Sequence, residues 1–202
     1  MTALLGLARR IDRLNDRFGT LAAWAVLLSG LISAANALVR YGFDYSSNAF
    51  LEIQWYLFAA CVMLGAAQVL RLNEHVRVDL IYSRIGTHAK VGVDLFGLVV
   101  FVLPVMSYAA WLSWDFFVVK LTTGMTPADT VSSLGLHGYL FKLMTSGELS
   151  GNAGGLIRWP AALMLPLGFA LVSLQGVSEV IKRVAWLAGL HDMDIQYERP
   201  LQ

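Results

Sequence analysis

The sequence predicts an all-α integral membrane protein with four transmembrane helices, and two observations indicate this class. Of its 202 residues, 57% are apolar and 14% are charged, whereas a soluble domain has roughly 45–50% apolar and about 25% charged residues. The apolar residues also form four stretches without any charge, at 21–39, 53–70, 95–114 and 161–178. A helix needs ~20 such residues to cross the hydrocarbon core of a bilayer, so each stretch can span a membrane.

We expect a single membrane domain over 1–202. With flanking residues included, the predicted elements are an amphipathic interfacial helix at 1–19, spans at 21–39, 53–70, 93–118 and 159–181, a cytoplasmic loop at 71–92, a long periplasmic loop at 119–158 and a cytoplasmic tail at 182–202. No cleaved signal peptide is expected, because a charged helical segment precedes the first apolar stretch.

The distribution of Lys and Arg predicts the orientation. Four precede the first span, four lie between the second and third, and three follow the fourth, which makes eleven on one side of the membrane. The connections on the other side contain four. The positive-inside rule places the richer side in the cytoplasm, so both termini should be cytoplasmic.

The segment 1–19 has the pattern of an amphipathic helix. Its apolar residues recur at intervals of three or four and are Leu4, Leu7, Ala8, Ile11, Leu14 and Phe18; its polar side contains Arg9, Arg10, Asp12, Arg13, Asp16 and Arg17. Such a helix should lie among the cytoplasmic lipid headgroups with its arginines toward anionic lipid. An arm packed on a partner protein explains the pattern equally well.

The outer ends of the first two spans contain polar residues that suit contacts with protein. Asn36 lies about one turn inside the predicted interface, where an amide facing lipid would be costly. Arg40 ends the first span and Glu52 begins the second on the same side of the membrane. We therefore predict an ion pair between Arg40 and Glu52.

Three features predict local changes of helix geometry. Pro104 lies inside the third span, where it removes one backbone hydrogen bond and should kink the helix. Arg71 and Asn73 should end the second span, because a cation suits a helix C-terminus and Asn tolerates the turn that follows. Within the long loop, residues 134–144 are apolar enough for a short helix.

Sequence signatures of catalysis are missing. The chain has no phosphate-binding glycine loop, no HExxH zinc motif and no GxSxG nucleophile turn. Its four histidines lie outside the spans, and Cys61 is its only cysteine. We therefore predict no enzyme activity, no catalytic residue, no cofactor and no metal site, and we expect no nucleic acid as a partner.

The spans also lack the features of a transport site. Secondary transporters normally have ionisable side chains or broken helices near the middle of the bilayer, and no charge occurs within the four apolar stretches. Small residues and isolated amides in the spans instead suit packing against another membrane protein. The sequence therefore predicts an accessory membrane subunit.

Three parts of the sequence form a recognisable pattern: "NALVRYGF", the following Glu and Tyr, and "LGAAQVLRLNEHVRVDLIY". Together they resemble the small membrane subunit of tripartite ATP-independent periplasmic (TRAP) transporters. The matching residues are Asn36, Arg40, Tyr41, Phe43, Glu52, Tyr56, Gly65, Ala66, His75, Val76, Arg77, Val78 and Asp79. The long outer loop, with "ELSGNAGGLIRWP", resembles a longer-loop branch of that family.

The resemblance implies a function that depends on partners in a bacterial inner membrane. A large multi-span subunit would contain the substrate and sodium sites, and a periplasmic substrate-binding protein would deliver an organic acid. The small subunit would act as a scaffold and help to dock the binding protein. Its candidate interface or structural residues are Asn36, Arg40, Tyr41, Glu52, Tyr56, His75, Arg77 and Asp79.

Two further interpretations use the same sequence differently. The chain would be the membrane anchor of a redox enzyme if Trp and His residues lined a quinone or haem pocket, or it would be a small porter acting alone.

For the loop after the second span, we predict that Arg77 and Asp79 pair to form a cytoplasmic clasp beside His75.

Overall fold

The computed structural model describes residues 1–45, 47–73, 85–190 and 192. The helical segments of this part of the chain are α1 (Thr2–Phe43), α2 (Asn48–Leu72), α4 (Thr87–Gly97), η1 (Leu98–Val102), α5 (Leu103–Thr122), α6 (Val131–Thr145) and α7 (Trp159–Leu187). α1, α2, the continuous α4–η1–α5 helix and α7 are each long and apolar enough to cross a membrane. The prediction of an all-α membrane protein with four spanning helices is confirmed.

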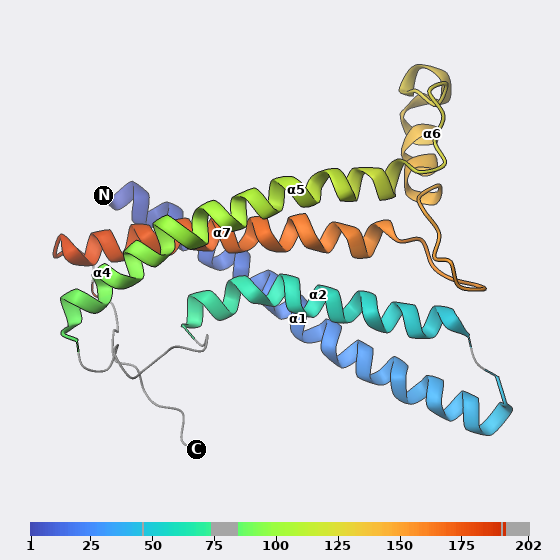
Figure 1. The fold of residues 1–202 in the computed structure, drawn as a ribbon, viewed down its shortest axis with the longest axis horizontal. Coiled ribbons are helices and arrows are strands. Elements are labelled where there is room, and N and C mark those ends of the chain that lie inside the picture. Colours follow the sequence, from blue (N-terminus) through green and yellow to red (C-terminus); the bar gives the residue numbers. More distant parts are fainter. Residues whose placement is uncertain (46, 74–84, 191, 193–202) are drawn as a thin grey trace.

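The four spanning helices lie side by side, in the order α5, α7, α2 and α1 (Figure 1). α7 contacts α5, α2 and α1, because the N-terminal part of α1 crosses toward it. The core cluster combines two small residues, Ala22 of α1 and Ala67 of α2, with Leu64 of α2 and Leu171 of α7. Such packing by small side chains is typical of membrane helices.

The contact between α2 and α7 depends on one glycine. A Cβ atom at Gly168 would lie 2.7 Å from both the Cβ and the carbonyl oxygen of Met63. That separation is too short for any side chain, and backbone on both helices would have to move. Gly168 therefore sets the distance between α2 and α7.

α1 includes both the predicted interfacial segment at 1–19 and the predicted span at 21–39. It is one continuous helix of 42 residues, and its buried residues recur every three or four positions along the first half: Ala8, Ile11, Asn15, Gly19, Ala22 and Ala25. Leu4, Leu7 and Leu14 of the predicted apolar face are exposed. The segment 1–19 thus packs on the chain's own helices through a face that includes polar residues.

The third span contains a π-helical turn close to Pro104, where the sequence predicts a kink. The π-helical turn η1 lies directly before it, and the N–H of Leu103 bonds to the carbonyl of Leu98, five residues back. Because proline has no N–H and its ring collides with the preceding turn of an α-helix, a wider turn at this place accommodates it.

The helices extend beyond the apolar stretches that predicted them. α4 begins at Thr87 although the span was expected from 93, and α7 continues to Leu187 although the span was expected to end at 181. Asn73 ends α2 with a left-handed backbone (φ 61°), as predicted. In the long loop, α6 covers the predicted short helix, and the side chain of Thr130 caps its first turn.

Candidate functional site

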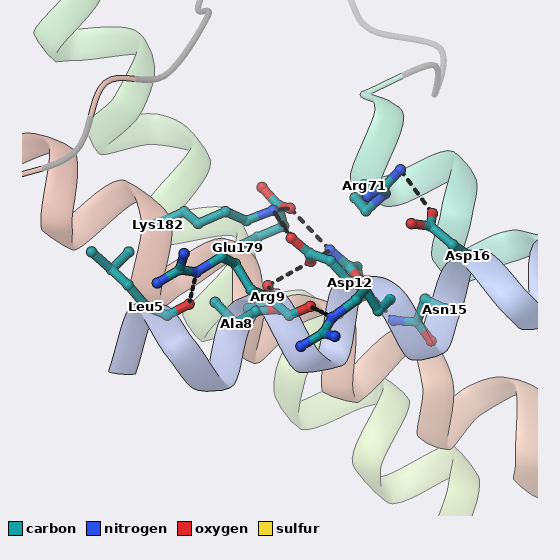
Figure 2. A network of polar contacts seen from close by, with 12 residues as sticks. Leu5, Ala8, Arg9, Asp12, Asn15, Asp16, Arg71, Glu179 and Lys182 are labelled. Carbon is teal, nitrogen blue, oxygen red and sulfur yellow. Dashed lines mark hydrogen bonds and ion pairs between the residues drawn. The ribbon is translucent and has the colours of Figure 1, made fainter. Parts of the chain in front are cut away.

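Two clusters of polar side chains lie at opposite ends of the helices. The first, which we call the terminal-end cluster, lies near the start of α1 and the end of α7 (Figure 2). Its residues are Asp12, Asn15, Asp94, Gln175, Ser178, Glu179, Lys182 and Arg183. The second, the loop-end cluster, consists of Glu52, Lys120, Glu148, Ser150, Asn152 and Arg158.

In the terminal-end cluster, Asp12 joins α1 to α7. Its Oδ1 accepts hydrogen bonds from Ser178 Oγ at 2.7 Å and Gln175 Nε2 at 2.9 Å, and its Oδ2 lies 3.3 Å from Lys182 Nζ. Asn15, one turn further along α1, donates to Gln175 Oε1 at 2.6 Å. Three side chains of this network, Asn15, Gln175 and Ser178, are completely buried.

The network continues along α7 and reaches the third span. Glu179 accepts from Gln175 Nε2 at 3.0 Å and forms ion pairs with Lys182 and Arg183. Arg183 Nη2 also lies 3.3 Å from Asp94 Oδ2 of α4. Since buried charges are costly unless they are paired, these contacts allow three helices to share charged side chains at one end of the bundle.

The loop-end cluster is centred on Glu52, which is 4% exposed. Its carboxylate accepts hydrogen bonds from Ser150 Oγ, from Asn152 Nδ2 at 2.7 Å and from the N–H of Leu156 at 2.7 Å. These donors all belong to the connection between α6 and α7. The N-terminal part of α2 therefore holds that connection in place.

A second group of ion pairs fixes the same connection to α5. Glu148 pairs with Lys120 of α5, and with Arg158 at 2.8 Å. The hydrogen bonds from these two cations hold the pKa of Glu148 below its usual value. Leu149 and Ile157 form an isolated antiparallel bridge between these residues, so the connection has a defined shape.

The structure places the residues predicted from the sequence in different surroundings. Glu52 lies in the loop-end cluster, and in the described part of the chain it makes no ion pair with Arg40, which is exposed. Asn36 and Tyr56 are half-buried, and Tyr41 is 87% exposed. The predicted clasp, His75, Arg77 and Asp79, lies outside the described residues.

Sequence reasoning missed the terminal-end cluster. A signal was present, because Gln175, Ser178, Glu179 and Lys182 are spaced by three, one and three residues and therefore share one face of a helix. Asp12 and Asn15 have the matching spacing on α1. Both sets lie at the borders of the apolar stretches, where polar side chains are also expected to face water.

In a comparison with protein-family models, residues 29–185 match "Tripartite ATP-independent periplasmic transporters, DctQ component". The chain belongs to this family. The DctQ component is the small permease subunit of a TRAP transporter, which works with a larger membrane subunit and a binding protein. No curated protein and no solved structure matches the chain.

The family membership identifies the chain as a transporter component. The DctQ family is a transporter component and not an enzyme family, which favours the transporter interpretation over the anchor of a redox enzyme. The four spanning helices and the family together identify a membrane protein.

Proposed function

We propose that the chain is the accessory subunit of a sodium-coupled importer of organic acids in a bacterial inner membrane. In this role it enlarges the fixed scaffold beside the large transport subunit, and its outer loop helps to dock the substrate-binding protein. The main observation in support is membership of the DctQ family over residues 29–185. The excess of Lys and Arg near the terminal-end cluster supports a cytoplasmic location of both termini.

The outer face of α5 is the proposed contact with the large subunit. In the most apolar 18-residue segment of the third span, 6% is buried within the chain, compared with 39% in the corresponding segment of α7. The face presents Tyr108, Trp111 and Trp114, which are 58%, 63% and 52% exposed. Aromatic side chains are enriched at the centres of protein interfaces, and within the described part of the chain each of these three is more than half exposed.

The loop-end cluster supports the docking role of the outer loop. Glu52 and Glu148 together fix the connection that includes Leu149, and the Leu149 side chain is 63% exposed. A fixed loop with an exposed apolar side chain loses little conformational freedom when a partner binds. We therefore place part of the binding-protein contact at Leu149.

Co-purification with the large subunit tests the α5 contact. The double variant Tyr108→Ala/Trp111→Ala should reduce recovery of the large subunit at least about tenfold, since interface aromatics of this kind often contribute 2 kcal/mol or more. The control is Leu38→Ala on α1, a residue that is 75% exposed and lies on a different face. Equal recovery with both variants would contradict the proposed face.

Uptake by cells tests the function itself. Deletion of this chain should abolish uptake of the organic acid while the large subunit is still present in the membrane. Leu149→Asp should lower uptake by weakening the binding-protein contact, whereas Leu190→Asp, an exposed change at the other end of the chain, should not. Unchanged uptake after deletion, with the large subunit stably present, would refute the proposed function.

A further inference from the structure

A basic cleft lies beside the N-terminal half of α1. It has a volume of about 590 Å³, and its lining residues are Gly6, Arg9, Arg10, Asp12, Arg13 and Arg71. Five of these belong to α1, and Arg71 is in the last turn of α2. The cleft therefore presents four guanidinium groups and one carboxylate.

The acidic groups near the cleft are already engaged. Asp12 is held by Lys182, Gln175 and Ser178 of α7. Asp16 pairs with Arg71 at 2.7 Å (Figure 2). The positive charge of the remaining three arginines is thus not balanced by an ion pair in the described part of the chain.

The arginine side chains have donors available for a ligand. Arg9 and Arg13 each use Nε to bond a carbonyl of their own helix at 3.3 Å, and their terminal nitrogens make no ion pair in the described part of the chain. The Nε of Arg71 is shielded from solvent and has no hydrogen-bond partner. A buried donor without an acceptor is uncommon, and an anionic oxygen in the cleft would satisfy it.

We propose that this cleft binds the phosphodiester headgroup of an anionic phospholipid. Arginine suits this ligand, because its planar group can bond two phosphate oxygens at once. Basic pockets beside membrane helices on the cytoplasmic side are a recurrent form of lipid site. The proposal concerns lipid alone and is independent of the transported substrate.

The surroundings of the cleft favour a lipid over a free phosphate ion. Leu7 and Leu14 of α1 are 45% and 39% exposed, and Leu72, next to Arg71, is 48% exposed. Apolar side chains beside a headgroup site can pack against acyl chains, whereas a soluble anion would gain nothing from them. The polar side predicted from the sequence also includes Arg17, but Arg17 does not line the cleft. If the lipid binds at a defined site, Arg17 should not contribute to binding. If it binds to a generally basic surface, Arg17 should contribute like the other arginines.

Gly6 provides a way to close the cleft without changing its charge. A Cβ atom at Gly6 would meet no atom within 4 Å, so the leucine side chain of Gly6→Leu would extend into the open space that the cleft occupies. Leucine is also a better helix former than glycine, so this variant should fold. Loss of lipid in Gly6→Leu would then result from filling the cleft and not from loss of the helix.

The test is a lipid titration of the full-length chain in detergent, followed by native mass spectrometry. The probes are phosphatidylglycerol and phosphatidylcholine with the same acyl chains, and inorganic phosphate as a competitor. Phosphatidylglycerol should bind about tenfold more tightly than phosphatidylcholine. Arg10→Gln and Arg13→Gln should each weaken it roughly fivefold, Gly6→Leu should weaken it similarly, and Arg17→Gln should leave it unchanged.

Three results would overturn the proposal. Equal binding of the two lipids would show that the headgroup charge is not recognised. An equal loss in Arg17→Gln and Arg13→Gln would show a diffuse basic surface without a site. Displacement of phosphatidylglycerol by millimolar inorganic phosphate would show a site for the free ion and not for a lipid.

Discussion

The two polar clusters stabilise different kinds of contact. The terminal-end cluster joins helices: Asp12, Gln175 and Arg183 link α1, α7 and α4 through side chains that are mostly buried. The loop-end cluster joins a helix to a loop, since Glu52 of α2 holds the connection between α6 and α7. Its ion pairs are more open to solvent, with the side chain of Arg158 47% exposed.

This difference predicts different consequences of losing a charge. When one partner of a buried ion pair is removed, the other charge remains in surroundings of low polarity, and this costs stability. An exposed pair is weakened by water and salt and contributes little. We therefore expect the terminal-end cluster to determine the stability of the helix packing, and the loop-end cluster to determine the shape of one outer segment.

The largest effect is expected for Asp12→Leu. The change leaves Lys182 buried with one partner fewer, and it removes the acceptor of Gln175 and Ser178. The free energy of unfolding should fall by about 3 kcal/mol, measured by denaturant unfolding in detergent micelles. Asp115→Leu, which changes an exposed Asp of α5, should have little effect.

A double variant separates loss of the charge pair from loss of packing. Asp12→Leu/Lys182→Leu removes both partners, so no buried charge is left without its original counterion. It should recover part of the stability lost in Asp12→Leu. Lys182→Leu alone completes the comparison. If the loss of stability in the double variant equals the sum of the losses in the two single variants, Asp12 and Lys182 do not interact as the structure describes.

A smaller effect is expected for Glu52→Gln. The three donors that face Glu52 need acceptors on both carboxylate oxygens, and glutamine offers an acceptor on one side only. The loss of stability should be confined to the connection between α6 and α7, because the donors left without an acceptor belong to it. It should appear as faster hydrogen exchange of the Leu156 amide and faster proteolysis of residues 146–158.

Arg40→Gln is the control for this change, because the sequence predicted that Arg40 pairs with Glu52. The structure places no such pair among the described residues, so Arg40→Gln should leave the exchange of the Leu156 amide unchanged. Faster exchange in Arg40→Gln would favour the ion pair expected from the sequence.

The fold was predictable because the signal for a membrane helix is local. Each span needs only enough successive apolar residues, and the stretches at 21–39 and 53–70 lie inside α1 and α2. Pro104 was equally informative, because the loss of its N–H affects its own turn. Helix ends were less predictable, since Lys182 and Arg183 remain helical once their charges are paired within the fold.

The terminal-end cluster was not predictable from the sequence in the same way. Asp12 and Lys182 are 170 residues apart, and neither local pattern identifies the other as a partner. Within 1–19, Leu4 and Leu7 are exposed, whereas Ala8, Ile11 and Asn15 are buried. In a membrane protein the surroundings can be as apolar as the core, so an apolar stripe does not show which face packs inward.

The smallest effect concerns Asp129, in the turn before α6. Its ion pair with Lys142 and its hydrogen bonds from Thr126 lower its pKa from the ordinary 3.8 to about 2. Because the folded state favours the charged form, this contribution to stability is complete above the ordinary pKa. It should be lost as the pH falls from 3.8 toward 2. Hydrogen exchange of α6, corrected for the intrinsic effect of pH, should therefore accelerate over this range.

Asp129→Asn should show the faster exchange of α6 already at pH 6 and should remove the dependence on pH between 4 and 2. Lys142→Met should move the midpoint of the acceleration up toward the ordinary value, because the hydrogen bond from Lys142 is the largest cause of the lowered pKa. Asp115→Asn, at an exposed position of α5, is the matched control. If it changes the profile as much as Asp129→Asn does, the acid sensitivity of α6 arises from the total charge of the protein and not from this pair.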